Sequence, residues 1–161
     1  MSRTSNNYGA PQGGGGSVTL TEVLLATDQS TTNGYDNLSY GTVVSDASVG
    51  TFTQGVSTTS GVDWTGVSST CTYEFLEAGI YSIEFNTYAA GYHNFAAMTL
   101  HPNGQAAPSE RINYFGVYAQ FSRKPQYVLR NFAVGDVIKF FNGSNSSDEP
   151  GFSRIKISKL T

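Results

Sequence analysis

Apolar and polar residues alternate with a period of two along much of the second half of the chain. In the segment 81–86, an apolar or aromatic residue occupies every odd position and a polar residue every even one. The segment 154–158 repeats this pattern, with isoleucine at 155 and 157. Because successive side chains of a strand point to opposite faces, both segments are predicted to be strands with one buried face. Further strands are predicted at 96–100, 115–121, 127–132 and 137–141.

The first half of the chain has a weaker pattern. The apolar residues between Val18 and Leu25 fit a strand or a helix by their spacing, and we predict a strand. Residues 29–70 are weakly hydrophobic and carry turn signals such as Asn33-Gly34, so two or three short strands are expected there. No stretch keeps a helical period over ten or more residues. The pattern as a whole predicts an all-β sandwich or jelly roll of about eight to ten antiparallel strands.

The composition agrees with a β protein. Gly, Ser, Thr and Asn together fill 65 of the 161 positions, and aromatic residues make up 13%. Thr, Tyr, Phe, Val and Ile fit a pleated sheet, while Gly, Asn and Ser supply turns. Only 13% of the residues are charged, about half the 25% that is average for soluble domains.

The first 16 residues differ from the rest and divide the chain into two parts. Residues 1–16 are polar and end in four consecutive glycines, a composition typical of a flexible linker. They form either an unstructured terminus or an arm that becomes ordered on contact with a partner. Residues 17–161 are predicted to form one domain.

Charge and hydropathy exclude several classes of protein. Nine basic against twelve acidic residues give a net charge of −3, which argues against a nucleic-acid partner, because phosphate binding depends on Lys and Arg. No apolar run approaches the roughly 18 residues of a membrane span, and the N-terminal residues contain no apolar stretch of the secretory-signal type. Cys71 is the sole cysteine, so no intrachain disulfide is expected.

No arrangement of residues points to catalysis, a cofactor or a metal, and we expect a protein that is not an enzyme. His93 and His101 lack the partner residues of a metal motif, and Cys71 lies in a predicted strand as a buried, inert thiol. Asp148-Glu149 could contribute to a calcium site, but an exposed loop fits two adjacent acids better. The basic residues of 123–124 and 154–159 are interpreted as exposed strand edges, with contact to an acidic partner as the alternative.

Four motifs in the later half resemble the jelly rolls of the C1q-like and tumour-necrosis-factor-like superfamily. The segment 73–83 is similar to the strand, glycine turn and "Gly-aliphatic-Tyr" strand of that superfamily. In order, 98–104 resembles its strand with an Asn-Gly turn, 132–137 its "Leu-x-x-Gly-Asp-x-Val" turn, and 152–157 its closing strand. Departures occur at Arg130, Arg154 and Lys156, where the family has aliphatic, glycine and apolar residues, so the closing strand is expected to have a more solvated face.

The resemblance implies a ten-strand jelly roll that assembles as a compact homotrimer, with apolar and aromatic side chains of one sheet at its centre. Ten Tyr and ten Phe exceed what one small core needs, and aromatic residues are enriched where subunits meet. Tyr114, Tyr118 and Tyr127 are the leading candidates for the trimer interface. The alternative is that these tyrosines form cross-strand pairs within one subunit.

Fold resemblance and composition together suggest a viral structural protein, most like those of bacteriophages, although fold alone does not define function. The first hypothesis is a capsid decoration, or cement, protein on the outer surface of the virion head. Its arm would attach to the major capsid protein through Arg3, Asn6, Asn7 and Tyr8, a multivalent contact in a trimer. The second is the receptor-binding tip of a tail or head fibre that binds a host glycan. A third is a trimer on a bacterial or exosporium-like surface.

Overall fold

A computed structural model describes residues 18–29, 40–57, 69–89, 94–117, 122–143 and 153–161, while the predicted arm, residues 1–16, lies outside the described residues. The described parts form ten β-strands and one short 3₁₀ turn, η1 (Pro102–Gly104). The strands are β1 (Leu20–Gln29), β2 (Tyr40–Ser45), β3 (Gly50–Ser57), β4 (Ser69–Phe75), β5 (Gly79–Ala89), β6 (Asn94–His101), β7 (Glu110–Val117), β8 (Ser122–Phe132), β9 (Val137–Gly143) and β10 (Ser153–Leu160). No helix in these parts of the chain is long and apolar enough to cross a membrane.

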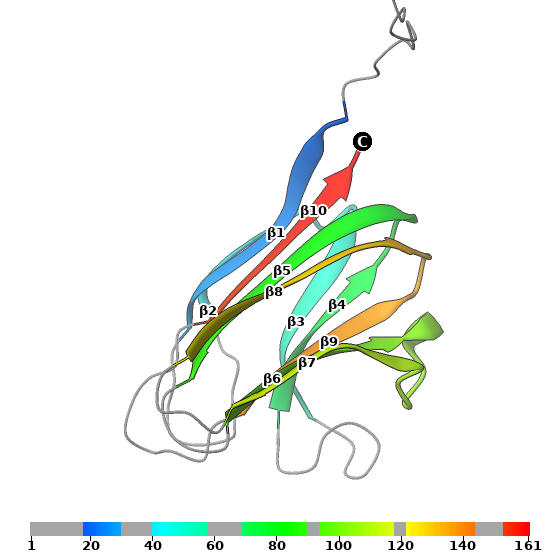
Figure 1. Cartoon of the computed structure of the whole chain (residues 1–161). Coiled ribbons are helices and arrows are strands. Elements are labelled where there is room, and N and C mark those ends of the chain that lie inside the picture. Colours follow the sequence, from blue (N-terminus) through cyan, green and yellow to red (C-terminus); the bar gives the residue numbers. More distant parts are fainter. Residues whose placement is uncertain (1–17, 30–39, 58–68, 90–93, 118–121, 144–152) are drawn as a thin grey trace, which may run out of the picture.

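The strands form two five-stranded antiparallel sheets packed face to face (Figure 1). The first sheet has the order β2-β1-β10-β5-β8 and the second β3-β4-β9-β6-β7. Without the edge strands β2 and β3, these are the two four-stranded sheets of a jelly roll. The first and last strands pair, and Thr19 and Thr161 extend that pairing with two backbone hydrogen bonds of 2.9 Å. The prediction of an all-β jelly-roll sandwich is therefore confirmed.

The core lies between the sheets and is filled by the alternating positions that the sequence marked. Tyr81, Ile83 and Phe85 of β5 and Ile155 and Ile157 of β10 are fully buried. Cα partners in the ladder confirm that these residues share a face, since Ile155 pairs with Phe85 and Ile157 with Ile83. The predicted strand at 18–25 is also confirmed, as β1. Its residues Leu24 and Ala26 are buried.

Four aromatic rings pack together near one end of the core. The ring of Phe75 stacks on Phe132 with centroids 4.2 Å apart and meets Tyr73 and Tyr81 edge-on at 5.0 and 4.8 Å. Gly50 lies against this cluster, where an added Cβ would come 2.2 Å from the Tyr73 ring. A side chain at position 50 is therefore incompatible with the present position of Tyr73.

The described turns lie at one end of the sandwich. They are residues 46–49, 76–78, 102–109 and 133–136, and we call this end the turn end. The start of β1 and the end of β10, marked C in Figure 1, lie at the same end. The opposite ends of the strands lead into 30–39, 58–68, 90–93, 118–121 and 144–152, which lie outside the described residues.

One sequence prediction is confirmed in part and another is wrong. The strand predicted at 115–121 coincides with β7 over 115–117, although β7 begins five residues earlier, at Glu110, and pairs with β6. Residues 118–121 lie outside the described residues. The basic residues of 154–159 do not lie on an edge strand, because β10 is the central strand of its sheet, between β1 and β5. Arg154 and Lys156 project from the face of that sheet instead. The expectation of a more solvated face on the closing strand is confirmed.

Candidate interaction surface

The outer face of the first sheet, which points away from the second sheet, brings together side chains from all five strands. In the ladder, Val44, Leu25, Lys156, Glu84 and Tyr127 are successive cross-strand partners from β2 to β8. A neighbouring row runs through Glu22, Ser158, Ser82 and Leu129. Residues opposite each other in an antiparallel ladder lie on the same face, so these two rows form one continuous surface.

Exposed apolar side chains are concentrated on this outer face. Nine large apolar or aromatic side chains are exposed among the described residues, and five of them are on this face. Tyr127 and Leu129 are 63% and 68% exposed, although both belong to a regular strand. The other three are Leu20, Val44 and Ile80. Isolated exposed apolar residues are normal, but a group on one face indicates an interaction surface.

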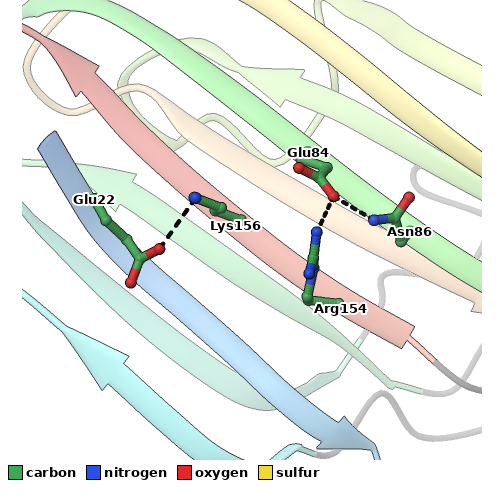
Figure 2. A network of polar contacts seen from close by, with 5 residues as sticks. All are labelled: Glu22, Glu84, Asn86, Arg154 and Lys156. Carbon is green, nitrogen blue, oxygen red and sulfur yellow. Dashed lines mark hydrogen bonds and ion pairs between the residues drawn. The ribbon is translucent and has the colours of Figure 1, made fainter. Parts of the chain in front are cut away.

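Four charged side chains that the structure describes on the outer face form two ion pairs. In Figure 2, the Glu84 carboxylate accepts hydrogen bonds from Arg154 and Asn86, and Lys156 Nζ lies 3.3 Å from a Glu22 carboxylate oxygen. Two acidic and two basic side chains therefore cancel within one subunit. Each ion pair is partly exposed, so its contribution to the stability of a single chain is at most about 1 kcal/mol.

A shallow hollow lies between the two rows of the outer face. Its volume is about 200 Å³, and it is lined by Leu20, Glu22, Ser82, Glu84, Lys156 and Ser158. Pockets for small molecules usually enclose about 300–1,000 Å³. A face with so small a hollow and with exposed apolar side chains is better suited to contact with another protein surface.

An ion pair also joins the two sheets at their β7 and β8 edges. Arg130 of β8, directly opposite Tyr81 in the ladder, forms a salt bridge with Glu110 of β7. The two partners come from different sheets. This explains how a charged residue is accommodated where the family pattern has an aliphatic one.

Two of the three predicted interface tyrosines, Tyr114 and Tyr127, belong to strands of different sheets. Tyr127 projects from the outer face opposite Glu84, and not opposite another aromatic ring. Tyr114 lies in β7, in the second sheet, where its backbone pairs with Ala97. The Tyr114 side chain and the whole of Tyr118 lie outside the described residues, as do Arg3, Asn6, Asn7 and Tyr8 of the predicted attachment site.

Four exposed residues of the outer face were not predicted as interface candidates from the sequence: Leu20, Val44, Ile80 and Leu129. A signal for Leu129 exists in the run Tyr127-Val128-Leu129, where apolar residues occupy both faces of one strand. A strand with one face exposed to water should alternate instead. No comparable signal marks Leu20 or Val44, because their places on the outer face depend on the pairing of distant strands.

Two of the remaining candidates for chemistry, Cys71 and His101, are buried side chains. Cys71 is fully buried, and burial raises the pKa of its thiol to about 12, so it is protonated at neutral pH. His101 is buried too: its ring nitrogens lie 2.9 Å from the Thr99 hydroxyl and the Gln105 carbonyl oxygen. His93, Asp148 and Glu149 lie outside the described residues. Within the described ranges, no group of three or more His, Cys, Asp or Glu residues could hold a metal ion.

No family model matches this chain, and no curated protein matches it. Its function is therefore inferred from the fold and from the outer face of the first sheet.

Proposed function

We propose that this chain is a capsid decoration protein of a virus, most like those of bacteriophages. It would form homotrimers on the outer surface of the head shell and stabilise the shell by binding the major capsid protein. In this function the protein acts through its surfaces, with neither a catalytic group nor a cofactor. Support comes first from the fold, because a ten-strand jelly roll is what the resemblance to C1q-like and tumour-necrosis-factor-like trimers implies.

The observation that carries the proposal is the group of five exposed apolar side chains on the outer face of the first sheet. Contact with two further copies would remove these side chains from water. The paired charges of Glu22, Lys156, Glu84 and Arg154 suit such contact, since they leave no net charge to repel an identical face. Tyr127 lies among these apolar side chains, as an interface residue would.

Attachment to the shell is assigned to the arm, residues 1–16, through Arg3, Asn6, Asn7 and Tyr8. A trimer presents three arms, and once one arm is bound, the others bind at a high effective concentration. Weak individual contacts then add up to firm attachment. The net charge of −3 fits a protein that contacts other proteins and not the packaged genome.

Cryo-electron microscopy of the purified virion tests this proposal. Density for the trimer on the shell lattice is the expected result, whereas density at the tail alone would identify a fibre tip and overturn it. Size-exclusion chromatography with light scattering should give the mass of three chains, and a monomer would contradict the trimer. Deleting residues 2–16 should leave the trimer intact and abolish its attachment to shells.

A further inference from the structure

Backbone hydrogen bonds join the turns at the turn end of the sandwich. The backbone N–H of Leu76 donates to the Val49 carbonyl at 2.9 Å, which joins the turn 76–78 to the turn 46–49. The Gly135 N–H donates to the Phe75 carbonyl at 2.8 Å, and the Phe75 N–H donates to the Asp136 carbonyl at 2.9 Å. Three turns from different parts of the chain are thus held by one another as well as by their own strands.

Exposed apolar side chains stand at the tips of these turns. Leu76 is 41% and Val134 is 56% exposed, although turn positions usually carry small or polar residues. Leu76 follows Phe75 and Val134 precedes Gly135, so the two side chains flank the same backbone hydrogen bond. The hydrogen bonds between the turns fix the backbone that carries these two side chains, so little backbone entropy is lost when a partner binds.

The charge of the turn end differs from that of the outer face. Glu77 is neutralised by Lys159, whose Nζ lies 2.7 Å from its carboxylate. Asp46 and Asp136 form no salt bridge within the described part of the chain, and their carboxylates accept hydrogen bonds from Ser48 and from the Ala133 N–H. The Ser48 hydrogen bonds hold the pKa of Asp46 below its ordinary value. The apolar pair is therefore accompanied by two uncompensated negative charges, which suit a partner surface that is apolar and basic.

The first described residues of the chain lie at this same end. Thr19 is held by two backbone hydrogen bonds to Thr161, and Val18, the first described residue, is 70% exposed. The described part of the chain therefore begins at the turn end, where β1 starts (Figure 1). If the arm attaches to a shell, the turn end is the part of the folded domain nearest to that shell.

We infer that the turn end is a second shell contact, in which Leu76 and Val134 dock onto an apolar, basic surface of the major capsid protein. The opposite end of the sandwich then points away from the shell. This inference rests on the proposed function. It adds which surface of the folded domain faces the shell and what chemistry the capsid surface must have.

The first test uses the double variant Leu76→Ser, Val134→Ser and heads of the parent virus that lack the decoration protein. The double variant should remain a trimer by light scattering, and its dissociation constant for the heads should rise at least tenfold. Wild-type binding should weaken as salt is added, because screening reduces the attraction between the carboxylates and a basic surface. If the folded double variant binds as tightly as wild type, the inference is overturned while the proposed function stands. If wild-type trimers do not bind the heads, both fail.

A second test measures directly whether a side chain at the turn end becomes inaccessible on binding. Leu76→Cys is treated with a maleimide before and after binding to the heads, and Thr53→Cys, exposed on the outer side of β3, is the matched control. Cys71 gives little background, because it is fully buried. The thiol introduced at position 76 should become protected on bound heads, while the thiol introduced at position 53 stays reactive. Protection at position 53 in place of position 76, or at neither position, overturns the inference.

Discussion

Replacing Leu129 by serine tests the proposed trimer interface at its most exposed apolar position. Leu129 lies on the outer face of the first sheet, opposite Ser82, and 68% of it is exposed in a single chain. The substitution removes little packing from the isolated subunit, so the subunit should fold normally. A trimer that covers the outer face would instead lose buried apolar surface from all three copies.

The expected loss follows from that exposed fraction. Complete burial of a leucine side chain contributes about 1.5–3 kcal/mol, so covering the exposed two-thirds contributes about 1–2 kcal/mol per copy. Three copies together lose about 3–6 kcal/mol. Because about 1.4 kcal/mol corresponds to a factor of ten, the trimer dissociation constant should rise by about 10²–10⁴-fold.

Sedimentation equilibrium over a range of concentrations measures this change directly. Val134→Ser is the matched control, since Val134 is 56% exposed but belongs to a turn and not to the outer face. The control should leave the trimer dissociation constant unchanged. Equal trimer stability for wild type and Leu129→Ser would refute the assignment of the outer face, as would an equal loss in both variants.

Three further predictions concern the folded subunit. Gly50→Ala should lower the free energy of unfolding in urea by about 1–3 kcal/mol, because the added Cβ overlaps the Tyr73 ring; full stability would show that Tyr73 moves without cost. Tyr73→Phe should leave the free energy of unfolding unchanged or raise it by about 1 kcal/mol, because the buried Tyr73 hydroxyl has no hydrogen-bond partner among the described residues; a clear loss would point to a partner. Burial raises the pKa of the Cys71 thiol from 9.0 to about 12. The buried neutral thiol should therefore make its full contribution to the free energy of unfolding below pH 9, and this contribution should decline as the pH rises to 12. In alkaline denaturation curves, Cys71→Ala should make that decline less steep.

Much of the fold was predictable from the sequence because strand formation has a local signature. The alternation around Ile83 and Ile157 marks which side chains enter the core, whatever strands they pair with. The turn at Val134–Asp136 was equally predictable, because glycine at position 135 adopts the positive φ angle of 84° that the turn needs. The alternation that begins at Phe115 marked only the last residues of β7 and gave no indication that this strand begins at Glu110.

The tertiary structure alone decided what the surface presents. Strand order made β10 central and so placed Arg154 and Lys156 on the outer face beside carboxylates from β5 and β1. Long-range pairing gathered Leu20, Val44 and Leu129, which lie far apart in the sequence, onto that same face. Periodicity identifies the two faces of each strand, but it carries no information about which strands become neighbours. That choice depends on contacts between distant residues. The sequence by itself therefore determined which side chains enter the core of a β-sandwich, and only the assembled sheets determined the surface that we propose binds other subunits.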